Sequence, residues 1–409
     1  MICRSPYNCL KINTNQEITV ISPRFIGSTL IVAGTALGAG MLAIPMVLAP
    51  LGLAMGLGLL LFTWAFTTFA ALLLLEVNIN HHPGDNMHAM SGHWLGKGGQ
   101  ILADIGMIFL LGFLLMAYIL GAGDLLQTAL AFIGLDVNAD ISRTLFTLLA
   151  SIAIILGTGM VDRVNRLFFI TMLATFAIAL YAMFTANSST PTVPQTAETA
   201  SSQFDIIMAA LPVLFTSFGF MVVIPPLVSY THGTGQQFSK VIVIGSLIPL
   251  VCYSLWFVAC MNTVEAHELA AFSGVKELVA ALGGESDWLN SVLQWFAAMA
   301  LLTSFLGVAL SLYGFFEEVC ERNNIKKSRL PAIALTLLPP LLMASSAPGQ
   351  FLQALSYAGL ALTVLAIFIP VAMVWRCRQD PKHDFTIPGG NISLIASMLF
   401  GVLLVVAQF

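Results

Sequence analysis

Histidines form the densest cluster of potential metal ligands or acid-base groups in this chain. Four of the seven lie in one short stretch, at His81, His82, His88 and His93. Neighbouring imidazoles can bind zinc, but zinc sites usually add cysteine thiolates or carboxylates at regular spacing. This stretch contains no cysteine and no pair of carboxylates at such a spacing. The sequence therefore favours a solvated loop and predicts no metal site.

The six cysteines also lack the spacing of a metal or redox site. They stand at Cys3, Cys9, Cys252, Cys260, Cys320 and Cys377. Isolated cysteines of this kind indicate free thiols. We therefore expect no bound cofactor.

Apolar segments are the elements that must position any site. Hydrophobic residues make up 58% of the chain and charged residues 9%, and the mean hydropathy is +0.91. Because about 20 apolar residues span a bilayer, these segments predict an all-α polytopic membrane protein. The eleven predicted spans lie near 25–49, 51–75, 101–124, 143–161, 166–186, 206–230, 240–262, 288–316, 330–346, 351–375 and 390–409.

The positions of lysine and arginine predict the orientation, because cytoplasmic loops retain positive charge. With residues 1–24 as a cytoplasmic tail, all 16 of these residues except Arg143 and Lys276 fall on the cytoplasmic side. An odd number of spans then places the C-terminus near the outer surface. The loops are too short for a separate soluble domain, and no basic patch indicates nucleic acid binding.

The middles of the predicted spans contain no ionisable side chain, which is informative because charge inside a membrane is costly and usually functional. Glu76 and Asp124 lie near span ends, where we expect them to face water or headgroups. A solute of zero net charge fits such spans best. Backbone N–H and C=O groups of broken helices can bind the carboxylate and the ammonium of an amino acid.

Glycines mark a candidate break in the first span. The segment "AGTALGAGML" (33–42) holds Gly34, Gly38 and Gly40 near mid-span. Gly34 and Gly38 alone would fit a small-xxx-small packing motif. The small residues continue through Ala39 and Gly40, however, and weaken the helix at one level. We therefore expect an unwound segment that exposes backbone groups.

A second candidate break lies five spans later. The stretch "LPVLFTSFGFMVVIPPLVSY" (211–230) has Thr216, Ser217 and Gly219 at its centre and Pro225 and Pro226 after them. Because five is odd, the second half must cross the membrane in the opposite sense, as in an inverted repeat. The predicted order is a cytoplasmic tail, a five-helix repeat, an outer loop, a second five-helix repeat, and an inner loop with an accessory helix. Their bounds are 1–24, 25–186, 187–205, 206–375 and 376–409.

Several stretches resemble the hydroxy and aromatic amino acid permeases. They are "IVAGTALGAGMLAIP" (31–45), "ALLLLEV" (71–77), "YILGAGDLL" (118–126), "LPVLFTSFGF" (211–220), "IPPLVSY" (224–230), "TSFLGVALSL" (303–312) and "LSYAGLAL" (355–362). The pairing of "FTSFGF" with "PPLVSY" is most similar to the tyrosine-specific branch, with the tryptophan branch as the nearer rival. The resemblance implies a LeuT-like five-plus-five fold and import of an aromatic amino acid across the bacterial inner membrane. We expect a monomer in membrane lipid.

The resemblance also implies binding roles for the two breaks. The amides around Gly38, Ala39 and Gly40 would hold the substrate carboxylate. The carbonyl of Ala36 and the second break, at Gly219, would take the ammonium.

Side chains near the breaks would complete the site. Hydroxyls could come from Thr35, Thr216 and Ser217, although serine and threonine in membrane helices often bond back to their own backbone. An aromatic substrate needs an apolar pocket with a polar group. The aromatic candidates are Tyr118, Phe215, Phe218 and Phe220.

The resemblance implies proton symport, but the coupling residue is not obvious. Some superfamily members use a lysine on the fifth helix, and residues 167–180 contain none. Glu76 and Asp124 are then the nearest proton-binding candidates. A sodium ion could instead bind carbonyls near Gly34 and Leu37 together with hydroxyls of the eighth span. Those hydroxyls belong to Thr303 and Ser304.

Three alternatives stay open at this point. The first is a tryptophan permease or one with a broader range of aromatic and hydroxy amino acids. The second is a membrane-embedded enzyme, which would need catalytic groups gathered at one membrane face and has only the loop histidines in its favour. The third is a sensor that binds an amino acid without moving it. The transporter is the preferred interpretation, so we expect no enzymatic activity.

Overall fold

Every regular element in the described part of the chain is a helix, as expected for apolar segments whose backbone groups must be satisfied inside a membrane. The computed structural model describes residues 23–409 except 157, 187–201, 232, 323–328 and 382. Nearly all of the predicted tail (1–24) and most of the predicted outer loop (187–205) lie outside this part.

The first half contains the elements up to the gap at 187–201. They are α1 (Pro23–Ala36), α2 (Gly40–Leu48), η1 (Ala49–Leu51), α3 (Gly52–Asn80), α4 (Met87–Phe132), α5 (Ala139–Leu156) and α6 (Thr158–Ala186). The second half contains α7 (Gln203–Ser217), η2 (Phe220–Val223), α8 (Ile224–Thr231), α9 (Gly235–Thr263), α10 (Ala266–Ala271), α11 (Val275–Gly283), α12 (Asp287–Arg322), α13 (Arg329–Ser346), α14 (Phe351–Thr363), η3 (Val364–Phe368), α15 (Ile369–Cys377) and α16 (Gly390–Val406).

Eight helical stretches of the described residues are long and apolar enough to cross a membrane, by length and composition. They are Gly40–Asn80, Met87–Phe132, Arg163–Thr185, Gln203–Ser229, Gly235–Thr263, Asp287–Cys320, Arg329–Ser346 and Phe351–Cys377. Two shorter apolar helices cover Arg24–Ala36 and Gly390–Val406. The described part of the chain is therefore all-helical, the protein is a polytopic membrane protein, and the number of eleven spans stays a prediction.

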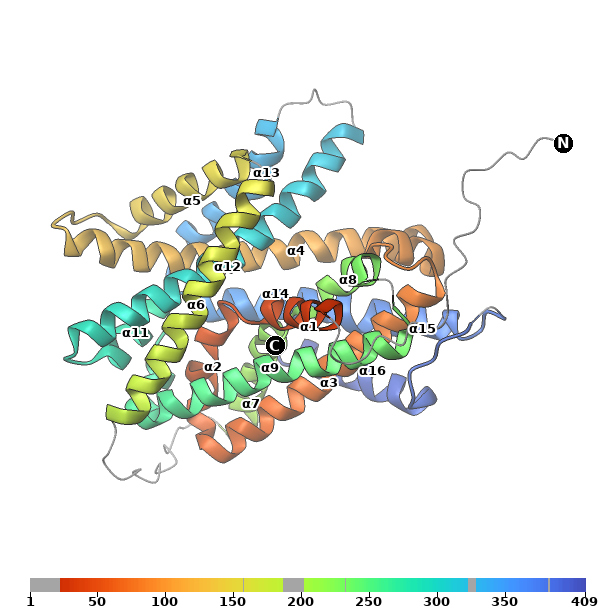
Figure 1. The fold of residues 1–409 in the computed structure, drawn as a ribbon, viewed down its shortest axis with the longest axis horizontal. Helices are drawn as coiled ribbons and strands as arrows, with labels where there is room; N and C mark the ends of the chain where they lie inside the picture. The colour runs from red at the N-terminus through yellow and green to blue at the C-terminus, as the bar shows by residue number, and fades with distance from the viewer. Residues whose placement is uncertain (1–22, 157, 187–201, 232, 323–328, 382) are drawn as a thin grey trace.

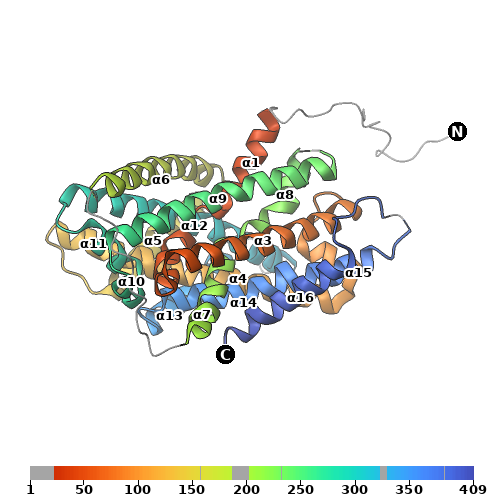
Figure 2. The same ribbon diagram turned by 90° about the horizontal axis from the view of Figure 1, so that it is seen from below.

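The helices lie close together around the two candidate breaks. In both views α3 and α9 run side by side, while α6 crosses other helices obliquely in Figure 1. The N-terminal end of α1 projects beyond the other helices in Figure 2, while the rest of α1 packs against α9. The largest fully buried side chains include Phe215, Phe218 and Phe220 beside the second break and Tyr253 and Trp256 on α9. Large buried side chains thus surround the second break.

The structure interrupts the helix at both glycine-containing sites. Leu37, Gly38 and Ala39 separate α1 from α2, and Phe218 and Gly219 separate α7 from η2. The prolines after the second site explain the tight 3₁₀ turn of η2, because Pro225 and Pro226 have no N–H to give to an α-helical bond. The two segments selected from the sequence are therefore the places where the helices unwind.

Two further irregularities lie outside the two breaks. Helix α4 begins well before the predicted span at 101–124 and is kinked at Gly96, whose φ of 76° suits only a residue without a Cβ. The predicted span at 351–375 contains the π-helical turn η3. Pro370, at the start of α15, cannot donate a backbone hydrogen bond into that turn, which accounts for the widened turn.

Candidate functional site

The two breaks are in direct contact. The hydroxyl of Ser217, the last residue of α7, donates to the Gly40 carbonyl at 3.1 Å and to the Val213 carbonyl at 2.8 Å. A Cβ placed on Gly40 would lie 2.8 Å from the Ser217 Cα. Glycine at position 40 is therefore required for the start of α2 to approach the end of α7.

Helix α12 holds the first break open. The Ala39 N–H donates to Ser304 Oγ at 3.2 Å, whereas in a continuous helix it would bond four residues back to Thr35. A Cβ on Gly38 would collide with the same Ser304 hydroxyl. The structure thus joins Gly38 and Ala39, which were predicted to bind the carboxylate, to Ser304, which was predicted as a sodium ligand.

A tyrosine of α9 bridges the two breaks. Tyr253 Oη lies 2.6 Å from the Ala36 carbonyl oxygen and 2.8 Å from the Ser217 carbonyl oxygen. These carbonyls close α1 and α7, where helix carbonyls lack an intrahelical partner. The Tyr253 side chain is fully buried.

The sequence reasoning missed Tyr253, although one signal was present. A tyrosine in the middle of an apolar span carries a hydroxyl that needs a partner when it is buried. Tyr253 stands mid-way along the predicted span 240–262. That signal indicates a polar contact but not which backbone groups provide it.

Tyr118 of α4 lies next to Ser304. Its side chain is buried, and its hydroxyl lies within hydrogen-bonding reach of Ser304. Tyr118 is also near enough to Tyr253 for an electrostatic interaction. A predicted aromatic candidate therefore lies next to the residues that shape the first break.

The hydroxyls of the two predicted threonines donate to backbone carbonyls. Thr35 is exposed and its hydroxyl donates to Ile31 O at 2.8 Å. The buried Thr216 donates to Pro212 O at 2.8 Å and to Leu355 O at 2.9 Å. These are the back-bonding geometries common for such residues in membrane helices, and Thr216 also ties α7 to α14.

The predicted phenylalanines are fully buried around the second break. The ring of Phe218 lies 5.0 Å from that of Tyr253, centroid to centroid, and Phe215 packs edge-on against Phe400 of α16 at 5.8 Å. Phe220 is also fully buried, whereas Gly219 is partly accessible. Phe218 is thus the aromatic candidate that contacts the bridging tyrosine.

The predicted sodium ligands belong to α1, the first break and α12. Gly34 packs against the ring of Phe169 on α6, with an added Cβ at 3.3 Å from that ring. The hydroxyl of Thr303 donates to Ala300 O at 3.1 Å, and Leu37 is buried. Of this set, Ser304 is the member with a hydrogen bond to the first break.

The family model for the tryptophan/tyrosine permease family matches residues 21–408. This chain belongs to the tryptophan/tyrosine permease family. The resemblance drawn from the sequence motifs is thereby confirmed.

Curated relatives cover nearly the whole permease. It is similar to Glutamine transporter 2 of Aliivibrio fischeri, with 37% identity over 94% of this chain and 99% of that protein. It is 35% identical to Tyrosine-specific transport system 1 of Haemophilus influenzae, over 94% and 96% of the two chains. The Tryptophan-specific transport protein of the same organism is 32% identical over 95% and 96%. The family and these relatives are transporters, so the chain is an amino acid permease and not an enzyme.

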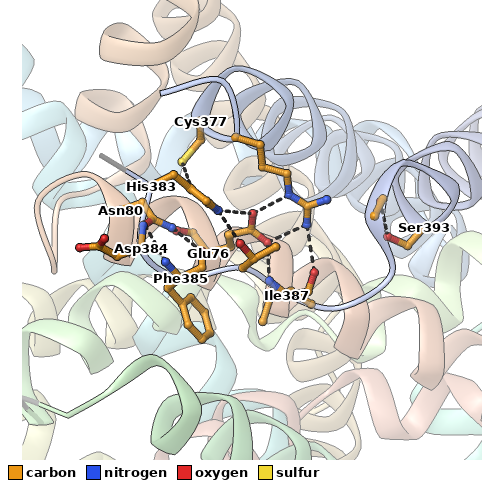
Figure 3. A network of polar contacts seen from close by, with 11 residues as sticks. Glu76, Asn80, Cys377, His383, Asp384, Phe385, Ile387 and Ser393 are labelled. Atoms are coloured by element: carbon orange, nitrogen blue, oxygen red, sulfur yellow. Dashed lines mark hydrogen bonds and ion pairs between the residues drawn. The ribbon is translucent and has the colours of Figure 1, made fainter. Parts of the chain in front are cut away.

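The side chain of Glu76 is fully buried. It accepts hydrogen bonds from Arg378 Nε at 2.7 Å and Nη2 at 2.9 Å, and from the Ile387 N–H at 2.8 Å; His383 Nε2 lies 3.6 Å away (Figure 3). The expectation that Glu76 faces water or headgroups is therefore wrong. The 378–389 loop, which lies 302 residues further along the chain, folds over it.

Asn80, one turn beyond Glu76, holds the same loop. Its side-chain oxygen accepts from the N–H groups of Asp384 at 2.9 Å and Phe385 at 3.1 Å, and its amide donates to Phe385 O at 2.7 Å. We call Glu76, Asn80 and Arg378 the loop clamp (Figure 3). The clamp fastens the connection between α15 and α16 to the end of α3.

Asp124 is also paired with an arginine. Its Oδ1 lies 3.0 Å from Arg143 Nη2, and the side chains are 21% and 4% exposed respectively. Arg143 reaches Asp140 as well, at 3.4 Å. The pair joins α4 to α5, and Asp124 keeps partial access to solvent.

An apolar cavity of about 490 Å³ lies between α4, α5, α6 and α12. Its lining includes Leu149 and Trp295, which are exposed on the surface of the protein. Its lining contains no residue of either break. An apolar recess that opens to the surface of a membrane protein suits lipid chains better than a zwitterion.

The loop histidines pack as an aromatic cluster. The ring of His81 lies 4.3 Å from that of His93 and 4.7 Å from that of His82. His88 pairs instead with Asp104, at 2.8 Å. Within the described residues, no group of three or more His, Cys, Asp or Glu side chains could hold a metal ion.

We expect acidification to loosen this cluster. Burial, and next the charges of His93 and His82, lower the pKa of His81 below its ordinary value of 6.5, against the opposing effect of Asp85 at 3.1 Å. The unfolded chain then binds a proton at His81 more readily than the folded chain does. The stabilisation from neutral His81 is therefore complete above pH 6.5 and is lost as the pH falls below it. The melting temperature in detergent should drop less between pH 7.5 and 5.5 in His81→Gln than in the wild type. The exposed His267→Gln variant is the control, and equal drops in all three proteins would contradict the prediction.

Proposed function

We propose that this permease imports an aromatic amino acid, with tyrosine as the first candidate, by proton symport and alternating access across the bacterial inner membrane. The observation that carries the proposal is the convergence of the Ala36 and Ser217 carbonyls on one point, beside the unwound Leu37–Ala39 backbone. This arrangement suits both charged ends of an amino acid.

Helix polarity supports a zwitterionic substrate. The C-terminal ends of α1 and α7 carry partial negative charge, and the N-terminal end of α2 carries partial positive charge. The substrate ammonium would therefore bind the carbonyls of Ala36 and Ser217. The carboxylate would bind the N–H groups around Gly38, Ala39 and Gly40, and the Ala39 N–H would then leave Ser304 Oγ.

The proposed architecture is a LeuT-like inverted repeat of eleven spans. Residues 25–186 and 206–375 would be the two repeats, and 376–409 would supply the inner loop and the accessory helix α16. The 1–24 tail would be cytoplasmic, 187–205 an outer loop and the C-terminus outer. In support, the helix breaks lie five predicted spans apart and meet in space, as expected of a site between two repeats. We propose a monomer, because one chain supplies both breaks.

Tyrosine is favoured by the aromatic surroundings of the breaks. Phe218 contacts Tyr253, and Tyr118 lies near both Tyr253 and Ser304. Relatives named for tyrosine and tryptophan transport support the same substrate class. The relative named Glutamine transporter 2, with 37% identity, makes glutamine the second candidate.

Proton coupling is proposed over sodium coupling because the resemblance to the permease family implies it. Asp124 is the better proton carrier, since its side chain is partly exposed whereas Glu76 is fully buried in the loop clamp. The sodium alternative needs Gly34, Leu37, Thr303 and Ser304 to converge. Gly34 packs on Phe169 and the Thr303 hydroxyl donates within its own helix, and neither contact uses the oxygen lone pairs that would bind sodium, so sodium stays the alternative.

The test is uptake of labelled tyrosine into proteoliposomes that contain the purified permease. A pH gradient and a sodium gradient are imposed separately, and unlabelled tyrosine, tryptophan, phenylalanine and glutamine are the competitors. We expect an inward proton gradient to raise the initial rate several-fold and unlabelled tyrosine to compete best.

Each part of the proposal can fail separately. Uptake driven only by sodium would overturn the coupling, and strongest competition by glutamine would overturn the aromatic substrate. Tyrosine binding without uptake under either gradient would identify a sensor. Empty liposomes under the same gradients are the control for leak.

A further inference from the structure

We infer that the Tyr253 hydroxyl competes with the substrate ammonium group for the Ala36 and Ser217 carbonyls. An amino acid would then reach the Ala36 and Ser217 carbonyls only when this hydroxyl releases them. The inference rests on the proposed amino acid site, and it adds a residue that controls access to that site.

The geometry places Tyr253 where a cation would bind. Its Oη lies 2.6 Å and 2.8 Å from the two carbonyl oxygens, which are distances typical of hydrogen bonds from a hydroxyl. Both carbonyls end helices and carry partial negative charge. The protein thus supplies a neutral donor at a point of negative potential.

One hydroxyl cannot satisfy the carbonyls of Ala36 and Ser217 as well as an ammonium can. Tyr253 has a single O–H, so it can donate one full hydrogen bond to Ala36 O or to Ser217 O. An ammonium has three donors and forms charge-assisted bonds, which are roughly twice as strong as neutral ones. A substrate therefore has a physical reason to displace the hydroxyl.

Displacement would be felt by both broken helices. Tyr253 is fully buried between them, and its ring packs against Phe218 at the second break. Ser217 is also bonded to Gly40 at the start of α2. A shift of Tyr253 would alter the contact between α1, α2 and α7, which links ammonium binding to movement of the helices.

The experiment compares an amino acid with an analogue that lacks the ammonium group. Binding of tyrosine and of 3-(4-hydroxyphenyl)propionate is measured on the purified wild type and on Tyr253→Phe. Removing the hydroxyl removes the competitor for the two carbonyls. We expect the preference for tyrosine over the analogue to increase about three- to tenfold, the equivalent of one neutral hydrogen bond. An unchanged or smaller preference would overturn the inference.

A matched variant controls for loss of a tyrosine hydroxyl in general. Tyr357→Phe removes a partly exposed hydroxyl that accepts from Gln353 on α14, at 3.0 Å. This variant should keep the wild-type preference. The same comparison with glutamine and its analogue without the amino group applies if the permease binds glutamine, because the inference concerns the ammonium and not the ring.

Hydrogen exchange tests the inference without any ligand. Loss of the bridge in Tyr253→Phe should speed amide exchange at Leu37–Gly40 and at Gly219–Met221 in the substrate-free protein, and Tyr357→Phe should not. Unchanged exchange would overturn the inference. Faster exchange in a protein that binds no amino acid would instead support the bridge and refute the proposed function.

Discussion

Replacing Gly40 by alanine should abolish most transport while the protein stays folded. The added Cβ would lie 2.8 Å from Ser217 Cα, 2.9 Å from its Oγ and 3.0 Å from its Cβ. The backbone of α7 cannot rotate away as a side chain can, so the start of α2 and the end of α7 must separate. A misplacement of about 1 Å at a binding site can lower activity by roughly 100-fold. Tyrosine uptake into proteoliposomes measures the loss.

The control for the Gly40 substitution is a glycine of the helix that follows, α3. Gly58 of α3 has nothing within 4 Å of an added Cβ, so Gly58→Ala should transport normally and be at least as stable as the wild type. Melting temperature and gel filtration in detergent verify that both variants are folded. Uptake by Gly40→Ala within about twofold of the wild type would contradict the close contact between the breaks.

The helix breaks could be predicted from the sequence because their causes are local. Closely spaced glycines weaken a helix wherever it lies, and Pro225 and Pro226 remove two backbone donors from the turn before them. The same reasoning identified Ser217 and Gly40 as neighbours of the breaks. Their direct contact depends on how α2 and α7 pack, which no local pattern contains.

Contacts between distant segments could not be predicted. Tyr253 reaches Ala36 across 217 residues of sequence, and Arg378 reaches Glu76 across 302. A lone tyrosine in an apolar span resembles ordinary packing, and a carboxylate near a span end resembles a surface group. A single sequence therefore does not identify the partner of Tyr253 or of Glu76.

Replacing Glu76 by glutamine should destabilise the permease strongly without removing its coupling. The carboxylate is fully buried and accepts bonds from the Arg378 guanidinium and the Ile387 N–H. Its loss would leave the Arg378 charge, 16% exposed, without its main partner. Breaking such a pair from one side typically costs about 3–5 kcal/mol. Thermal unfolding in detergent and amide exchange of the 378–389 loop measure the effect.

Two comparisons separate the loop clamp from a proton carrier. Glu285→Gln, at an exposed position, controls for loss of a carboxylate and should melt like the wild type. The double variant Glu76→Gln, Arg378→Gln should lose less stability than the two single variants lose in sum, because it also removes the unpaired Arg378 charge. If Glu76 only fastens the 378–389 loop, the folded fraction of Glu76→Gln still takes up tyrosine faster under an inward proton gradient. If Glu76→Gln instead melts like the wild type and its uptake does not respond to the proton gradient, Glu76 is the proton carrier. The pairing with Arg378 would then be the means of releasing the proton.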